Sequence, residues 1–218
     1  MKIDPGWVVD NAGRIGELIG EHLYLTLIAV GIGLVISFAL ALAIRRWRVL
    51  SGPIIGITGT LYAIPSLALF ALLVPITGLT SILTAEIALV SYTLLILTRN
   101  ILAGLDGVPP EVVEAADGMG LTSTQRLLRV ELPLALPVVV AGLRIATVTT
   151  IGLVTVTALI GLGGLGYLIV TIGINRGAFG LTATLTGIVL AVGLAGIADL
   201  GLLALQRALT PWSRGSGA

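Results

Sequence analysis

Few side chains in this 218-residue sequence could carry out chemistry. There is no cysteine and one histidine, His22, so disulfides, thiolate metal sites and multi-histidine metal sites are excluded. His22 is also the sole candidate base for serine catalysis, and we expect it instead to be an interfacial residue. Lys2 is the only lysine, and a phosphate-binding loop of the Walker A type requires a Gly-Lys-Ser/Thr ending. We therefore expect no enzyme active site and no bound metal or cofactor.

A glycine-rich run, Gly161-Leu-Gly163-Gly-Leu-Gly166, matches the dinucleotide-binding fingerprint G-x-G-x-x-G. That motif needs a preceding strand and an acidic residue about 20 positions later. Here the run follows a long apolar segment, and no Asp or Glu lies between Glu131 and Asp199. The run therefore predicts a flexible turn at the outer end of that segment.

The composition indicates that these residues are positioned by membrane-spanning helices. Hydrophobic residues make up 56% of the chain and charged residues only 11%, whereas a soluble domain is about one quarter charged. Segments of about 20 apolar residues, the length that spans a bilayer as a helix, lie at about 23–44, 53–76, 82–103, 134–160 and 181–205. They are continuously apolar, unlike the alternating strands of a membrane barrel. The predicted fold is an all-α integral membrane protein of about five transmembrane helices.

The placement of basic residues predicts the orientation. With the N-terminus outside, the inner side receives eight of the 12 basic residues and the outer side three, Lys2, Arg14 and Arg176. Residues 1–22 are then an extracytoplasmic segment without the features of a signal peptide, 106–133 a cytoplasmic loop and 206–218 a cytoplasmic tail. Trp47 and Trp212 fall at the inner interface. The eight inner residues are Arg45, Arg46, Arg48, Arg99, Arg126, Arg129, Arg207 and Arg214.

Charges inside spans are costly and are functional candidates by default. Arg144 lies within the fourth predicted span, and we expect it to be a structural partner for Asp199 near the cytoplasmic end of the fifth. Glu86 lies near the outer end of the third span, where it could reach water or line an outer vestibule.

The polar segment 106–133 predicts two short helices joined by a glycine turn. Pro110 suits a helix start, and Gly118 and Gly120 end that helix. Thr122 and Gln125 have the spacing of a capping box for a second helix, which we expect to end at Pro133. The second helix would present an apolar side to a pocket on a partner, formed by Leu121, Leu127, Leu128 and Val130.

The spacing within this loop resembles the EAA loop of ABC importer permeases. Its fixed positions correspond to Glu114, Ala115, Ala116, Gly118, Gly120, Val130, Leu132 and Pro133, with Val130 in place of the usual isoleucine. The resemblance implies a type I importer permease whose loop is a coupling helix seated in a cleft of an ATPase subunit. It also implies that Glu114, Ala115, Ala116 and Gly120 make that contact.

Four further segments, 62–75, 97–100, 142–146 and 158–166, resemble permeases for osmoprotectants such as glycine betaine, choline or carnitine. The implied protein lies in the bacterial inner membrane with a second permease copy or paralogue. A pair of ATPase subunits carries the ATP and Mg, and a separate periplasmic or lipid-anchored binding protein supplies most of the selectivity. Candidate residues for the translocation path are Tyr62, Pro65, Ser66, Phe70, Tyr92 and Asn100.

Alternatives remain open at this stage. The chain could be an ABC permease for another small solute, such as methionine or a sulphonate. A secondary transporter would have inverted repeats and ionisable groups near the midplane, where carboxylates are scarce here. A membrane enzyme would need paired histidines or carboxylates. The sequence leaves undecided which solute is carried, whether the permease pair is a homodimer, and whether osmolarity controls it.

Overall fold

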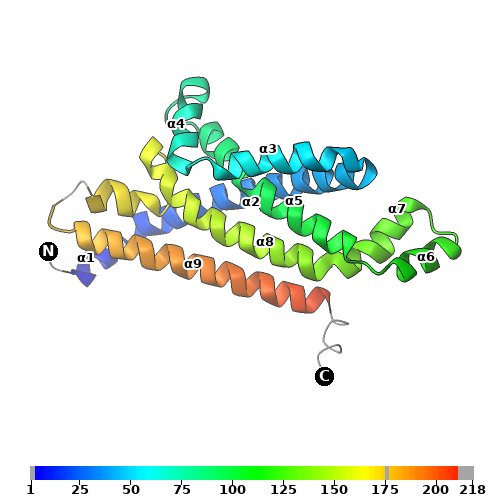
Figure 1. The fold of residues 1–218 in the computed structure, drawn as a ribbon. Helices are drawn as coiled ribbons and strands as arrows, with labels where there is room; N and C mark the ends of the chain where they lie inside the picture. The colour runs from blue at the N-terminus through cyan, green and yellow to red at the C-terminus, as the bar shows by residue number, and fades with distance from the viewer. Residues whose placement is uncertain (1–2, 175–176, 211–218) are drawn as a thin grey trace.

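The structure, a computed structural model, describes residues 3–174 and 177–210. Throughout these residues the regular elements are helices, which confirms the predicted all-α class. The helices of the bundle are α1 (Pro5–Asp10), α2 (Ala12–Arg46), α3 (Ser51–Ala63), α4 (Ser66–Thr77), α5 (Ile82–Asp106), α8 (Leu132–Val154) and α9 (Gly180–Leu209). Two short helices, α6 (Pro110–Gly118) and α7 (Ser123–Arg126), lie at one end of the bundle, and the N-terminus lies at the other (Figure 1).

The described part of the chain has four helical stretches long and apolar enough to cross a membrane. They are α2, α5, α9 and the continuous run Ser123–Ile160. The bent pair formed by α3 and α4 makes a fifth if it is counted as one span. The prediction of about five transmembrane helices is therefore confirmed.

Helix α2 begins 11 residues before the predicted span at 23. Its first turns carry Arg14, Glu17 and Glu21, whose spacing of three and four places them on one helix face. Arg14 pairs with Glu17 at 2.8 Å. Hydropathy detects only the apolar part of a helix, so this charged extension was missed.

The predicted span 53–76 is wrong as a single helix. It is divided into α3 and α4, whose axes differ by 98°. The break lies at Ile64 and Pro65, because the residue before a proline is restricted to extended conformations and proline donates no backbone hydrogen bond. Pro75 lies within α4, whose last residue is Thr77, one residue beyond the predicted end of the span at 76.

Helix α5 lies at the centre of the bundle, where it packs against α2, α3, α4 and α8, while α8 packs against α9 (Figure 1). Glycines allow these close contacts. A Cβ atom on Gly104 of α5 would lie 2.9 Å from the carbonyl oxygen of Ala135 on α8. Gly142 of α8 is in similar contact with Asn100 of α5. The packing of α5 against α8 thus depends on small residues on both helices.

The segment after α8 is more ordered than the predicted flexible turn. The 3₁₀ helix η3 (Thr155–Ile160) extends α8, and the π helix η4 (Tyr167–Ile174) folds back against α9. Between them Gly161 and Gly164 have φ of +81° and +80°, values that glycine adopts without strain. The glycine run is therefore a defined reversal of the chain.

His22, which we had expected at a membrane interface, is completely buried. Its Nε2 lies 3.0 Å from the carbonyl oxygen of Ile151 on α8, and its Nδ1 accepts a hydrogen bond of 3.2 Å from the amide of Leu165. The interfacial interpretation was wrong because the glycine reversal places its backbone over this part of α2. His22 instead links α2, α8 and the reversal.

Several sequence predictions concern residues outside the described ones, namely Lys2, Arg176, Trp212 and Arg214 and the end of the predicted tail. Trp47 is described, and its side chain is exposed directly after α2 ends. Its place at the inner interface stays a prediction.

Candidate functional site

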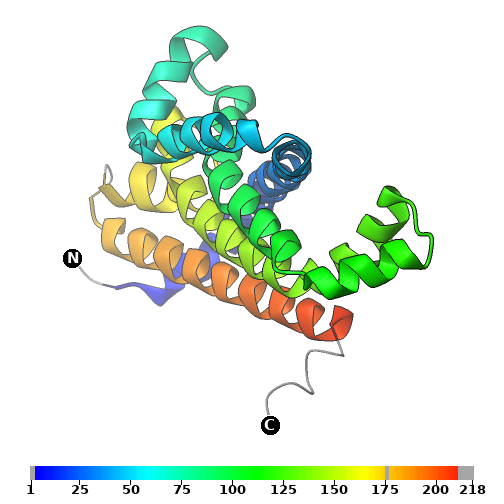
Figure 2. The same cartoon turned by 45° about the vertical axis from the view of Figure 1, so that its right-hand side comes forward.

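The α6–α7 hairpin extends to one side of the bundle (Figure 2). Helix α6 begins at Pro110 and ends at Gly118, and Gly120 follows with φ of +79°. Both predicted bonds of the capping box are present, because Thr122 accepts from the amide of Gln125 and the Gln125 side chain accepts from the amide of Thr122. The predicted helix–glycine turn–helix is therefore what the chain forms.

The loop residues that the resemblance singles out are not all available to a partner. Glu114, Ala115, Gly118 and Gly120 are exposed, but Ala116 is only 1% exposed. The carbonyl oxygen of Ala116 accepts from the amide of Leu121, which closes the turn. Ala116 therefore packs inside the hairpin, and its expected direct contact with an ATPase is replaced by a role in shaping the loop.

We had predicted that the second short helix ends at Pro133, and this prediction was wrong. Helix α7 continues through a π-helical turn, η2 (Leu127–Glu131), directly into α8. The amide of Leu132 bonds to the carbonyl oxygen of Leu127, five residues back, which is the π pattern. Because Pro133 lies in the first turn of α8, its missing amide breaks no bond within that helix. Val130, Leu132 and Pro133 are half-buried at this junction.

A buried carboxylate joins the hairpin to the bundle. Glu131 is 1% exposed and accepts hydrogen bonds from Arg45, in the last turn of α2, and from Nε of Arg126 at 2.8 Å. Arg126 also binds both carboxylate oxygens of Asp117 in α6, each at 2.6 Å. These ion pairs, which we call the Glu131 cluster, connect α6 and α7 to the end of α2.

A second carboxylate extends the Glu131 cluster to the surface. Asp106, the last residue of α5, lies 3.6 Å from Nε of Arg45 and binds Arg48 at 3.1 Å and 3.3 Å. Asp106 accepts these hydrogen bonds from the Arg48 guanidinium, which raises the pKa of Arg48. Sequence reasoning did not select this cluster. The available signal was a glutamate placed directly before an apolar span.

Four of the predicted path residues gather at the break between α3 and α4. Tyr62, Pro65 and Ser66 flank it, and the hydroxyl of Tyr92 on α5 donates to the carbonyl oxygen of Ile64. The rings of Tyr62 and Tyr92 meet edge-on, with centroids 6.1 Å apart. Irregular backbone at membrane depth is tolerated where protein covers it or where it lines a cavity. Among the described residues, the break between α3 and α4 is therefore the candidate part of a translocation path.

The other two predicted path residues lie elsewhere. Phe70 is 1% exposed within the apolar core formed by α2, α4 and α5, so in this structure it cannot face a path. Asn100 is half-buried where α5 packs against Gly142 of α8, and its amide donates to the carbonyl oxygen of Ile96. In this structure both side chains lie in packing contacts between helices.

The intramembrane charges have contrasting environments. Arg144 and Asp199 form the expected pair, with two hydrogen bonds of 2.8 Å between α8 and α9. Glu86 is buried to 8% exposure, and within the described residues neither of its carboxylate oxygens has a hydrogen-bond partner. Burial excludes the expectation that Glu86 reaches water in this structure.

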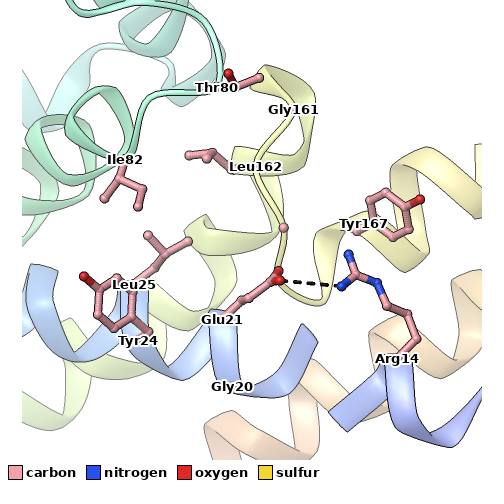
Figure 3. Close-up of a pocket in the computed structure, with 11 residues that line it drawn as sticks. Arg14, Gly20, Glu21, Tyr24, Leu25, Thr80, Ile82, Gly161, Leu162 and Tyr167 are labelled. Carbon is pink, nitrogen blue, oxygen red and sulfur yellow. Dashed lines mark ion pairs between the residues drawn. The ribbon is translucent and has the colours of Figure 1, made fainter. Parts of the chain in front are cut away.

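A pocket of about 560 Å³ lies among elements at the end of the bundle opposite the hairpin (Figure 1), and Figure 3 shows the residues that line it. It is formed by α2, the linker between α4 and α5, the glycine reversal and η4. Arg14 and Glu21 contribute opposite charges, and Tyr24 and Tyr167 contribute aromatic rings. Among the described residues, no group of three His, Cys, Asp or Glu side chains is arranged to hold a metal ion.

Residues 29–212 match the family described as the binding-protein-dependent transport system inner membrane component. The chain belongs to this family. One relative of this permease is the osmoprotectant import permease protein OsmW of Salmonella typhimurium, 39% identical over 94% of this chain and 96% of its own length. The glycine betaine/carnitine/choline transport system permease protein OpuCB of Bacillus subtilis is 33% identical over 92% of this chain and 91% of its own.

Solved structures agree with the fold of the permease. A chain of the inward-facing MetNI methionine ABC transporter superposes with a TM-score of 0.76 at 25% identity, over 90% of this permease and 96% of that chain. A chain of an amino acid ABC transporter gives a TM-score of 0.78 at 18% identity, over 95% of this permease and all of that chain. The second likeness concerns the fold alone.

Proposed function

We propose that this chain is the membrane-spanning permease subunit of an ATP-driven importer for quaternary-amine osmoprotectants such as glycine betaine, choline or carnitine. The observation that carries this proposal is the 39% identity to an osmoprotectant import permease along nearly the whole of both chains. A methionine importer is the second candidate, because the MetNI chain has the same fold. Its identity of 25% favours it less.

The exposed face of α6 is the proposed contact with a partner ATPase. Glu114 and Ala115 of α6 and Gly120 of the following turn present a charge, one small side chain and a residue without a side chain, which allow close approach of another backbone. A displacement of α6 is transmitted to the end of α2 by a chain of ion pairs. Asp117 of α6 pairs with Arg126, Arg126 pairs with Glu131, and Glu131 pairs with Arg45 of α2. The segment that contains Arg126 and Glu131 also continues into α8 as one helical run. The bundle then has two conformations, and a ligand bound at either end shifts the equilibrium between them.

Helix α9 supports the assignment of a membrane location and further subunits. In the most apolar stretch of 18 residues in α9, only 6% of the residues are buried against the rest of the chain. Such a surface requires lipid or another apolar subunit to cover it. A second permease copy or paralogue and the acyl chains of the lipid together cover the apolar surface of α9. The hairpin end is cytoplasmic and the pocket end extracytoplasmic, as the distribution of arginines favours.

The α3–α4 break is the proposed part of the translocation path. Tyr62 is 39% exposed there, and its ring edge contacts the Tyr92 ring that covers the break. Replacing Tyr62 with alanine should lower uptake without loss of assembly, because the side chain is largely outside the core. Phenylalanine at the same position is the matched control that keeps the ring. Unchanged uptake by the alanine variant would remove Tyr62 from the path.

The function is tested with the whole transporter. The permease is purified from native membranes, its attached subunits are identified by mass spectrometry, and the complex is reconstituted in liposomes with its binding protein. We expect ATP-dependent uptake of radiolabelled glycine betaine or choline, and no uptake of methionine. Methionine uptake would support the second candidate. Uptake by the permease alone, driven by an ion gradient without ATP, would contradict both.

A further inference from the structure

The pocket at the extracytoplasmic end contains a carboxylate that the backbone holds in place. Oε2 of Glu21 accepts a hydrogen bond of 2.9 Å from the amide of Gly164. A Cβ atom on the neighbouring Gly163 would overlap the Glu21 carboxylate, so the glycine reversal must lie this close to α2. Oε1 of Glu21 is 3.7 Å from Nη1 of Arg14, which is too long for a hydrogen bond. Oε1 is thus held by an ion pair without a hydrogen bond (Figure 3), so a ligand cation can replace Arg14 at one oxygen of a fixed carboxylate.

Two aromatic rings lie beside this carboxylate. The sequence has four tyrosines, and two of them, Tyr24 and Tyr167, line the pocket (Figure 3). The guanidinium carbon of Arg14 lies 5.4 Å from the centroid of the Tyr167 ring, so that ring already receives a cation on its face. Aromatic faces with a nearby carboxylate form a favourable environment for quaternary ammonium groups, which cannot donate hydrogen bonds.

The charges are arranged for a ligand that carries both signs. Glu21 and Arg14 lie two helical turns apart on α2, and their side chains are 43% and 46% exposed, so both can reach a ligand. A trimethylammonium group placed against Glu21 and Tyr24 leaves a carboxylate two bonds away within reach of Arg14. The apolar part of the wall, which includes Leu25 and Ile82, suits the methyl groups.

We propose that this pocket is a site at which the permease itself holds its substrate, a small zwitterion or cation with a quaternary ammonium group. Glu21 and Tyr24 contact the ammonium, and Arg14 contacts the carboxylate when there is one. This inference rests on the proposed function and adds to it, because it gives the permease selectivity of its own in addition to that of a binding protein. It also makes Arg14 the residue that distinguishes glycine betaine from choline.

The test measures equilibrium binding of radiolabelled glycine betaine and radiolabelled choline to the permease–ATPase complex in nanodiscs, without the binding protein. Glu21→Gln should weaken both ligands about tenfold, the effect of losing one ion contact in a partly exposed site. The glutamine oxygen still accepts from the Gly164 amide, so the fold is retained. Arg14→Gln should weaken glycine betaine by a similar factor and should not weaken choline. Asp10→Asn, which neutralises an exposed carboxylate at the end of α1 outside the pocket lining, should change neither.

Tyr24→Leu provides an independent variant, because Tyr24 is 54% exposed and its loss does not disturb the core. It should weaken both ligands. Wild-type affinities in both Glu21→Gln and Tyr24→Leu would overturn the inference while leaving the proposed function intact, provided that the complete transporter takes up glycine betaine. If the complete wild-type transporter takes up no quaternary amine, the proposed function fails, and the inference fails with it.

Discussion

The carboxylate of Glu131 accepts a hydrogen bond from the guanidinium of Arg45, a residue 86 positions earlier in the chain. The contact joins the first residues after the hairpin to the last turn of α2. Glu131 is nearly inaccessible to solvent, whereas the Arg45 side chain is 25% exposed. Arg126 neutralises the same carboxylate from the other side. The position of the hairpin relative to α2 therefore depends on one buried acidic group.

Replacing Glu131 with glutamine should uncouple the hairpin from α2. We expect a loss of about 2 kcal/mol in stability, since one charged acceptor of two arginines is removed. Substrate-stimulated ATPase activity and uptake should fall, while basal ATPase activity persists because α6 still docks. Arg129→Gln, which alters an exposed arginine of the same turn, is the matched control. Equal stimulation by substrate in the Glu131 and Arg129 variants would contradict this role.

The exposed hairpin gives a second prediction, for the contact with the ATPase. Gly120→Trp should abolish transport while the subunit still inserts, because the bulky side chain blocks close approach at an exposed position. Glu114→Lys should have the same effect through reversal of charge. Gly120→Ala is the control for backbone strain alone, since φ of +79° costs alanine about 1 kcal/mol. Substrate-driven ATPase activity at the wild-type level in the tryptophan and lysine variants would rule out α6 as the coupling contact.

His22 should contribute to stability rather than to transport chemistry. Its two ring nitrogens bond to backbone groups of α8 and the glycine reversal, which requires the neutral ring with hydrogen on Nε2. His22→Ala leaves the Ile151 carbonyl and the Leu165 amide without this partner, at a cost of about 2–4 kcal/mol. His22→Gln, with both a donor and an acceptor, should recover part of the loss. Thermal unfolding in detergent measures both, and an unaltered midpoint in the alanine variant would refute the prediction.

The Arg144–Asp199 pair should behave as a unit. Either Arg144→Met or Asp199→Leu alone leaves an unpaired charge between α8 and α9, which is costly within membrane-spanning helices. The double variant removes both charges and should be more stable than either single variant by about 1 kcal/mol or more. A double-mutant cycle on thermal unfolding gives the coupling energy. Additive effects of the two substitutions would mean that the pair contributes nothing as a pair.

Glu86 allows the opposite prediction. A buried carboxylate without a hydrogen-bond partner among the described residues destabilises the isolated subunit. Glu86→Met should therefore raise the midpoint of thermal unfolding of the purified permease. Glu86→Gln, which keeps the size and polarity but not the charge, should have a smaller effect. A lower midpoint in the methionine variant would contradict this prediction.

The amino-acid sequence by itself determined the membrane class, the number of spans to within one, and the hairpin. Each of these depends on local chemistry. A run of apolar residues must be a helix in lipid because its backbone groups have no other partner. Pro110, Gly120 and the Thr122–Gln125 capping box act within a few residues of one another. Local signals of this kind can be read without knowing what lies nearby in space.

The tertiary structure decided which polar residues act together. Arg45 meets Glu131, His22 meets Leu165, and Glu21 meets Gly164, across separations of 86, 143 and 143 positions. It also decided how the predicted second span divides into α3 and α4 at Pro65, where Tyr92 of another helix donates to the carbonyl oxygen of Ile64. A hydrogen bond between distant segments depends on how whole helices pack, and packing depends on contacts that no single stretch of sequence contains.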